Sequence, residues 1–404
     1  MRRVDRDRVF LRAGDETWTY GEAGREVEAR LVDHPRSMRL SLSPDSVFDV
    51  IAGISGGGAT VVGPDSEATE PGDTDLVVFT SGTIGPPKGV RLTMGNLIAA
   101  AAASAEHLGH DADDDWLLAM PLHHVGGLSI IVRQAYTGGS VTMLSGFDSS
   151  EFASAMRGSV TMVSVVPTML ARLVEHGPFS GLRAVLVGGG PIPPGLLEKA
   201  ADSGLPVLPT YGMTETFGQV ATLRPDASLA YEAHPLPGVD MRIGPDGRIA
   251  VKGPQVSPGY LGRPDRPDPW FVTNDLGEIG EGGALRVLGR SDTLIVTGGE
   301  NVAAERVESV LRQHPGVREA VVVGVPDAEW GEKVVCVYVG EAPTLRDWAS
   351  ARLPAFMVPK QWHEVGTIPA TSIGKPDRAA VARLAKDLTD RGAEEDVEPP
   401  PGQD

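Results

Sequence analysis

The residues best suited to chemistry lie in one short stretch, residues 80–89, which reads Thr-Ser-Gly-Thr-Ile-Gly-Pro-Pro-Lys-Gly. It follows residues 75–79, an apolar run of the length expected for a buried strand. Glycines let a backbone approach a bulky anion, hydroxyls and amide N–H groups donate to phosphate oxygens, and Lys88 adds a positive charge. The stretch is not a Walker A loop, because Pro87 precedes the lysine and Gly89 follows it. The residues alone fit a phosphate-binding loop and a surface turn about equally well.

A second candidate is the pentapeptide Tyr211-Gly212-Met213-Thr214-Glu215, which follows a strand-like run. The tyrosine can stack on a purine, Thr214 can bond a phosphate oxygen, and Glu215 offers the hard oxygen ligand that Mg²⁺ prefers. The alternative is a turn in which Thr214 and Glu215 begin a helix.

Three further stretches have ordinary structural explanations. Gly188-Gly189-Gly190-Pro191 suits a strand-to-helix turn, and Gly298-Gly299-Glu300-Asn301 suits a glycine turn with Asn301 as a helix cap. Lys375 suits a solvated lysine ahead of a helix that begins with Pro376.

Together these stretches resemble, in order and in residue type, the motifs of the adenylate-forming enzymes, which include the acyl-CoA synthetases. Residues 80–89 resemble their phosphate-binding signature, residues 211–215 match a second signature at every position, and Gly374-Lys375 resembles their catalytic lysine loop. The resemblance runs from about residue 15 to about residue 385. It implies an ATP-dependent acid–CoA ligase, in which a carboxylic acid and ATP·Mg²⁺ give an acyl-adenylate and pyrophosphate. The thiol of coenzyme A then displaces AMP.

The resemblance also implies roles for individual residues. ATP or AMP is contacted by Thr80, Ser81, Gly82, Thr83, Gly85, Lys88, Gly188, Gly189, Gly190, Pro191, Tyr211, Gly212, Met213, Thr214, Asp275 and Arg290. The CoA step involves Gly298, Gly299, Glu300 and Asn301. The metal ligand is Glu215, the hinge is Asp292, and the catalytic residues are Lys375, Glu215, Thr214 and His124.

The implied lysine has a clear physical purpose. A carboxylate that attacks the α-phosphate of ATP brings two anions together, and an ammonium that touches both offsets the repulsion and the charge of the transition state. One departure from the family is Asn274, which stands where a glycine usually precedes Asp275. For Asp275 and Arg290 the alternative to ribose binding is an exposed salt bridge.

The acyl group is expected near His124, Gly189 and Arg133. Residues 129–133 and 166–170 resemble the o-succinylbenzoate–CoA ligases of menaquinone synthesis in particular. Their substrate is a dicarboxylate, and its second carboxylate needs a cation or donors to offset its desolvation. A ligase for another aryl or short-chain acid, an adenylation enzyme that loads a carrier protein, and a non-catalytic nucleotide-binding protein are the alternatives.

Short apolar strands alternate with helical stretches from residue 75 to about 220, which predicts a doubly wound α/β sheet that binds ligands beyond the carboxyl ends of its strands. Short strands and tight turns over 238–290 predict a small β-barrel-like part. We expect a large domain over 1–290 with a shortened N-terminal subdomain. We also expect a small mobile α+β domain over 291–386 and a disordered acidic tail over 387–404.

Composition narrows the classes of partner. The chain has 404 residues and a formal charge of −18, which argues against general binding to nucleic acid. Its single cysteine, Cys336, suits a reducing cytoplasm, and no apolar run approaches the roughly 20 residues of a membrane span. The expected partners are a small carboxylic acid, ATP and CoA, and a homodimer stays open.

Overall fold

The computed structural model describes residues 4–31, 37–38, 40–56, 60–62, 73–80, 87–193, 195–225, 233–370 and 376–395. The strands up to β12 are β1 (Val9–Ala13), β2 (Glu16–Thr19), β3 (Ser37–Met38), β4 (Thr60–Val62), β5 (Leu76–Phe79), β6 (Gly89–Leu92), β7 (Asp115–Leu118), β8 (Ser140–Met143), β9 (Met162–Val165), β10 (Ala184–Val187), β11 (Val207–Met213) and β12 (Gly218–Thr222). The later strands are β13 (His234–Pro235), β14 (Asp240–Ile243), β15 (Arg248–Lys252), β16 (Gly259–Tyr260), β17 (Phe271–Ile279), β18 (Leu285–Arg290), β19 (Leu294–Thr297), β20 (Glu300–Ala303), β21 (Glu319–Asp327), β22 (Gly331–Val339) and β23 (Gln361–Glu364). The α-helices are α1 (Tyr20–Arg30), α2 (Pro44–Ser55), α3 (Met94–Leu108), α4 (Val125–Thr137), α5 (Ser149–Met156), α6 (Pro167–Leu173), α7 (Leu196–Asp202), α8 (Ala304–Leu311), α9 (Leu345–Ser350) and α10 (Arg378–Glu395). None of the described helices is long and apolar enough to cross a lipid bilayer.

A nine-stranded sheet in the order β13-β12-β11-β10-β9-β7-β8-β1-β2 is the centre of the N-terminal part. The run from β11 to β1 is parallel throughout, and β12 and β2 pair antiparallel at its two ends. Strands β7, β8, β9 and β10 alternate along the chain with helices α4, α5 and α6, so the doubly wound α/β prediction is confirmed.

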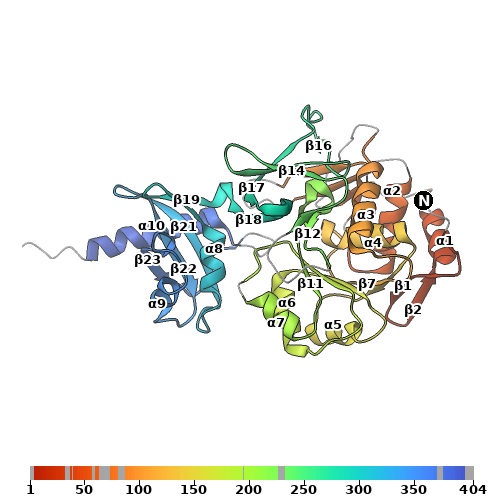
Figure 1. Cartoon of the computed structure of the whole chain (residues 1–404), viewed down its shortest axis with the longest axis horizontal. Coiled ribbons are helices and arrows are strands. Elements are labelled where there is room, and N and C mark those ends of the chain that lie inside the picture. Colours follow the sequence, from red (N-terminus) through yellow and green to blue (C-terminus); the bar gives the residue numbers. More distant parts are fainter. Residues whose placement is uncertain are drawn as a thin grey trace, which may run out of the picture. The chain divides into compact units, whose positions relative to one another are not determined.

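Helices cover both faces of this sheet, and they do so because alternate strand residues point to opposite sides. Met162 joins one core with Leu97 of α3 and Leu128 of α4, whereas Val163 joins another core with residues of α5, α6 and α7. Figure 1 shows α5, α6 and α7 gathered together, away from α3 and α4. The first core also contains Leu76 and Val90 of a second sheet, ordered β16-β6-β5-β4-β3, so α3 and α4 pack between two sheets.

A four-stranded sheet, β14-β15-β17-β18, forms the predicted small β part. Its first hairpin, one of the tight turns expected over 238–290, turns at Pro245-Asp246-Gly247, and Ile243 pairs with Ile249 across it. Gly247 takes a φ of 77°, a left-handed conformation that glycine adopts without a steric penalty.

The C-terminal part is built on a sheet in the order β20-β19-β22-β21, with β23 paired to β22. Val322 and Cys336 face a core that includes residues of α8 and α9. Val321 and Val335 face a second core that includes Val381 of α10. Helices on both faces of a mixed sheet make this an α+β unit with its own cores.

The chain divides into two compact units, each with its own internal packing. Unit 1 comprises the described residues of 1–81, 87–273 and 278–286, and unit 2 comprises those of 274–277 and 287–404. The division passes through β17 and β18, and the predicted boundary at 290/291 lies four residues beyond the last residue of unit 1.

Two sequence-based expectations are wrong in detail. Disorder does not begin at residue 387, because α10 continues to Glu395, where Ala, Leu, Lys and Arg sustain a helix that packs on β21 and β22. Asn301 does not cap a helix either. It lies in β20, and α8 begins after Ala303, which makes no side-chain capping hydrogen bond.

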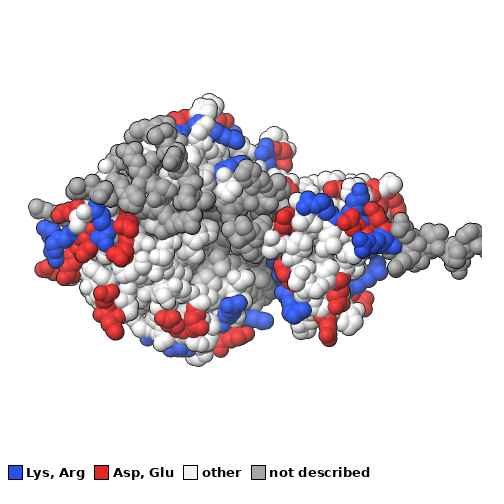
Figure 2. All heavy atoms as spheres, turned by 180° about the vertical axis from the view of Figure 1, so that it is seen from behind, with Lys and Arg blue, Asp and Glu red and all other residues white. Residues whose placement is uncertain are grey.

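Surface charge is mixed. Figure 2 shows Lys and Arg interspersed with Asp and Glu over the described residues of the face in view. Most of the described ion pairs involve an exposed partner, such as Arg286–Glu278 at 2.8 Å, and each contributes little to stability. A buried cation that forms no ion pair with a described carboxylate differs from these surface pairs and is therefore a candidate site residue.

One buried carboxylate joins three elements of unit 2. Glu308 of α8 accepts from Arg378 of α10 and from Arg312, both at 2.8 Å, and from the backbone N–H of Val322 in β21 at 2.9 Å. Burial raises the pKa of this carboxyl, and the two arginines act in the opposite direction.

We expect Glu308→Ala to destabilise unit 2 by about 3–5 kcal/mol, because it leaves two guanidinium groups without their shared buried anion. The measurement is urea unfolding followed by the fluorescence of Trp330, Trp348 and Trp362, which all belong to this unit. Glu329→Ala removes an exposed carboxylate from the same unit and is the control. Equal midpoints for the two variants would contradict this expectation.

Candidate functional site

The loops singled out from the sequence follow the carboxyl ends of neighbouring parallel strands. His124 follows β7, Val166 follows β9, Gly188–Gly190 follow β10, and Tyr211 lies near the end of β11. Since β7, β9, β10 and β11 are parallel neighbours, these segments share one edge of the sheet.

The glycine segment after β10 depends on the absence of side chains. A Cβ on Gly188 would lie 2.7 Å from a methyl group of Thr210, which belongs to the neighbouring strand β11. Gly189 has a φ of 79°, and a Cβ on it would lie 3.4 Å from Val166. The backbones after β9, β10 and β11 therefore approach one another closely at this edge.

Residues 211–213 of the pentapeptide end β11, and Thr214 and Glu215 begin the tight, sterically restricted turn to β12. A Cβ on Gly212 would lie only 2.0 Å from the carbonyl oxygen of Gly218, so this position requires glycine. Residues 214–216 form a single 3₁₀ turn, which ends at the buried Phe217 with a φ of 49°. A bulky residue with positive φ is uncommon, and such strain often accompanies functional sites.

The predicted phosphate loop is closed at its base by the β5–β6 hairpin. The N–H of Thr80 donates to the carbonyl of Lys88 at 2.9 Å, and the Thr80 hydroxyl lies 3.4 Å from both the N and the O of Lys88. Ser81, Gly82, Thr83 and Gly85 lie outside the described residues.

A tyrosine that the sequence analysis missed connects two predicted site residues. The hydroxyl of Tyr260 donates to Oε1 of Glu215 at 2.8 Å, and Nζ of Lys88 lies 5.6 Å from the centre of its ring. Burial and the neighbouring Glu215 raise the pKa of this hydroxyl, so it stays protonated as a donor. The only local sign of this residue in the sequence is an aromatic side chain after Pro258-Gly259. Its place beside Lys88 depends on the pairing of Tyr260 with Val90, which lie 170 residues apart in the chain.

Glu215 fits the role of a magnesium ligand. Its Oε1 accepts from Tyr260, and no described residue donates to Oε2. Among the described residues no three His, Cys, Asp or Glu side chains gather into a metal-binding group. Mg²⁺ needs no such group, since it is commonly held by one or two carboxylates together with water and substrate phosphates.

Arg133 is the most deeply buried of the predicted acyl-site residues, with 5% of it exposed. Its Nη2 donates to Oε1 of Gln219 at 3.3 Å, and its guanidinium lies 5.0 Å from the ring centre of Trp116. Within the described part of the chain no carboxylate forms an ion pair with it. Burial lowers its pKa to about 10, so the guanidinium is still charged at neutral pH.

His124 does not share this environment. It is exposed and stands at the N-terminus of α4, whereas Arg133 is nine residues farther along. That separation is a rise of roughly 13 Å along the helix axis. The two residues predicted to hold one carboxylate therefore lie at different depths.

Asp275, Arg290 and Asp292 form a cluster in unit 2. Arg290 bonds Asp292 at 2.5 and 2.8 Å and approaches Asp275 at 3.4 Å. Asn274 also reaches Asp292, at 3.5 Å. The salt bridge considered as the alternative exists, and it joins both predicted ribose contacts to the predicted hinge residue.

The segment predicted for the CoA step is a hairpin tip. Gly298 and Gly299 join β19 to β20 with φ values of 58° and 83°, which a two-residue type I′ turn requires. The N–H of Gly298 donates to the carbonyl of Trp330 at 2.8 Å. Lys375 lies outside the described residues, between the paired residues Ala370 and Pro376.

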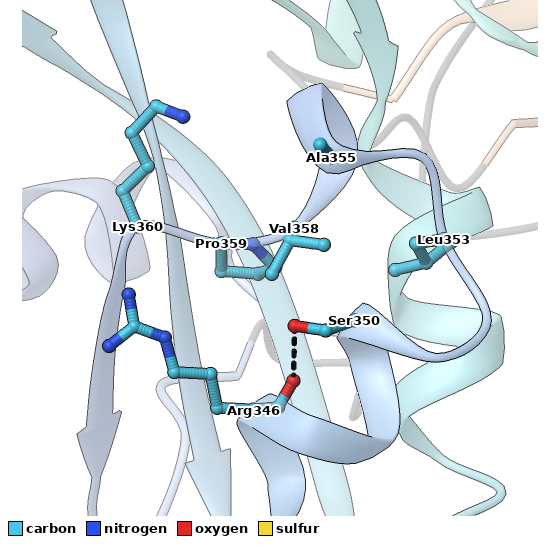
Figure 3. Close-up of a pocket in the computed structure, with 7 residues that line it drawn as sticks. All are labelled: Arg346, Ser350, Leu353, Ala355, Val358, Pro359 and Lys360. Carbon is cyan, nitrogen blue, oxygen red and sulfur yellow. Dashed lines mark hydrogen bonds between the residues drawn. The ribbon is translucent and has the colours of Figure 1, made fainter.

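Unit 2 also contains a hollow of about 300 Å³. Its lining residues are Arg346, Ser350, Leu353, Ala355, Val358, Pro359 and Lys360, drawn in Figure 3. The Lys360 ammonium lies 3.9 Å from the ring centre of Trp330, and no described carboxylate forms an ion pair with Arg346 or Lys360. Two cations at one hollow suit an anionic group.

Family models match most of the chain. The family described as "AMP-binding enzyme" matches residues 30–261, and "AMP-binding enzyme C-terminal domain" matches residues 306–375. The second match begins in α8 and ends at Lys375.

Individual relatives agree with these matches. The chain is 40% identical over 328 residues to the 2-succinylbenzoate–CoA ligase of Bacillus licheniformis, which covers 75% of this chain and 68% of that protein. It is 37% identical over 357 residues to the ligase of the same name from Bacillus cereus, covering 81% and 74%.

Solved structures extend the likeness to the fold. The o-succinylbenzoate CoA synthetase of Bacillus subtilis in complex with its acyl-adenylate intermediate superposes with a TM-score of 0.83 at 30% identity, covering 93% of this chain and 95% of that one. The same enzyme with ATP and a magnesium ion gives a TM-score of 0.82 at 30% identity, covering 92% and 96%. The chain belongs to the AMP-binding enzyme family and is one of its AMP-forming acid–CoA ligases, which act through an acyl-adenylate.

Proposed function

We propose that this enzyme joins o-succinylbenzoate to coenzyme A, using ATP and Mg²⁺. The observation that carries the choice of acid is the buried guanidinium of Arg133, which has a neutral amide and an indole as neighbours and no described carboxylate as a partner. Desolvating a cation is costly unless an anion offsets it. A substrate with a second carboxylate supplies that anion, and the curated relatives carry the name of such a substrate.

In our proposal the succinyl carboxylate reacts and the ring carboxylate faces Arg133. The position of Gly218 is compatible with this arrangement. A Cβ added to Gly218 would lie 3.9 Å from Nη2 of Arg133 and 4.0 Å from Oγ of Ser129. Glycine at 218 leaves space at that point. We assign Arg133 alone to the ring carboxylate and His124 to the outer part of the acyl site.

The first half-reaction follows from the charges. An oxygen of the succinyl carboxylate attacks the α-phosphorus of ATP, the bond to the bridging oxygen breaks, and pyrophosphate leaves with that electron pair. We assign the β- and γ-phosphates to the Thr80–Lys88 loop and the metal to Glu215. Mg²⁺ neutralises phosphate charge, and Lys375 stabilises the reacting oxygens.

The second half-reaction needs a different set of groups. The CoA thiolate attacks the acyl carbonyl carbon, and AMP leaves with the electrons of the carbon–oxygen bond. We assign this step to the Gly298–Asn301 hairpin, with movement of the C-terminal domain about Asp292. The anion-compatible hollow at Arg346 and Lys360 is a candidate for the phosphate groups of CoA.

We expect Arg133→Met to raise the KM for o-succinylbenzoate by roughly 30-fold or more, because losing one partner of a buried charge pair costs about 2 kcal/mol or more. The KM for 4-oxo-4-phenylbutanoate, which keeps the succinyl chain and lacks the ring carboxylate, should change little. ATP–pyrophosphate exchange measures both.

Arg172→Met, which removes an exposed guanidinium from α6, is the matched control. Exchange with other acids but none with o-succinylbenzoate in the unmodified enzyme would end the proposal for this substrate. Equal effects of Arg133→Met on both acids would end the role of Arg133.

We expect Lys375→Ala to slow acyl-adenylate formation by at least ~10²-fold, the scale of one preorganised electrostatic donor. Thioester formation from supplied acyl-adenylate and CoA should persist, since the lysine acts only in the first half-reaction. Lys386→Ala, on an exposed position of α10, is the control. Comparable losses in both half-reactions would refute this division of labour.

A further inference from the structure

We propose that Tyr260 is a positioning residue for magnesium–ATP: its hydroxyl fixes the carboxylate of Glu215 for the metal, and its ring sets the place of the Lys88 ammonium. The inference rests on the proposed roles of Glu215 and Lys88. It adds Tyr260 to the site as the residue that contacts both of them.

The backbone fixes Tyr260 beside the phosphate loop. β16 pairs antiparallel with β6, so that Tyr260 lies opposite Val90, and the N–H of Leu261 donates to the carbonyl of Gly89 at 2.7 Å. Lys88 lies two residues before Val90 and therefore faces the same side of the strand pair. This diagonal relation brings the ammonium to within 5.6 Å of the ring centre, a cation–π distance.

The same short segment holds Glu215 at two points. The backbone N–H of Ser257 donates to the carbonyl of Glu215 at 2.8 Å, and three residues later the Tyr260 hydroxyl donates to its Oε1 at 2.8 Å. A carboxylate can only accept, so the hydroxyl is the donor. With Oε1 held, the carboxylate is restricted in rotation, and Oε2 is the oxygen left for the metal.

The segment is itself anchored to elements of unit 1. Oγ of Ser257 donates to the carbonyl of Arg91 at 2.6 Å, and the side-chain amide of Asn96 donates to the carbonyls of Pro254 and Val256 at 2.8 and 3.2 Å. Tyr260 thus belongs to a rigid support and not to a loose surface loop. Groups that orient a metal ligand in this way commonly change metal affinity by 10–100-fold when they are removed.

Two substitutions separate the contributions of hydroxyl and ring. Tyr260→Phe keeps the ring near Lys88 and its partial packing against the core, but loses the donor to Glu215. We expect the Mg²⁺ concentration for half-maximal ATP binding to rise on the order of 10-fold. Tyr260→Leu also loses the ring, and we expect it to weaken ATP binding further at saturating Mg²⁺.

The direct measurement is calorimetric titration of the full chain with ATP at a series of Mg²⁺ concentrations, without any acid present. The same dependence is then followed by ATP–pyrophosphate exchange, while thioester formation from supplied acyl-adenylate should stay unchanged. Since the titration needs no acid substrate, failure of o-succinylbenzoate as a substrate and failure of this inference give different results.

Tyr20→Phe is the matched control, because the hydroxyl of Tyr20 donates to the carbonyl of Gly139 at 2.7 Å in the core packing of unit 1. It should lower stability without moving the Mg²⁺ dependence. An unchanged Mg²⁺ dependence in Tyr260→Phe overturns the proposal. So does a shift of the same size in Tyr20→Phe, which would mean that loosened packing alone is responsible.

Discussion

The parallel alignment of β7, β9, β10 and β11 is the constraint on which the candidate site depends. Parallel strands end at one edge of a sheet, so segments separated by up to about ninety residues of chain reach the same edge. The close approach of Gly188 to Thr210 and of Gly212 to Gly218 then fixes how near the backbones come. In both places the missing side chain is what permits the geometry.

A second layer of positioning comes from antiparallel pairing in the other sheet. β16 is only two residues long, yet its pairing with β6 places Tyr260 between Lys88 and Glu215. The parallel sheet therefore positions the pentapeptide with Glu215, and the second sheet positions the base of the phosphate loop. The side chain of Tyr260 contacts both Glu215 and Lys88.

The strands, turns and motifs of the site could be predicted from the sequence, but the contacts between distant residues could not, for a physical reason. Buried strands such as β9 and β10 are local apolar runs, and the 245–247 turn has local chemistry, so both were predictable. The Tyr260–Glu215 bond and the environment of Arg133 depend on strand pairing and helix packing between distant residues, which no local pattern encodes. The extent of α10 was missed because its acidic residues resemble a solvated tail, whereas packing on β21 and β22 stabilises the helix.

The ion pairs of Arg290 connect the residues that we propose for ribose binding to the residue that we propose as the hinge. Arg290 bonds Asp292 closely and Asp275 more weakly, so the cation belongs mainly to the proposed hinge residue. A ribose that bonds Asp275 and Arg290 would compete with part of this arrangement, because a guanidinium has a limited number of donors. Nucleotide binding would then change the contacts of the residue about which we propose that the C-terminal domain moves. A change of partner at one arginine is a physically simple way to couple ligand binding to the hinge.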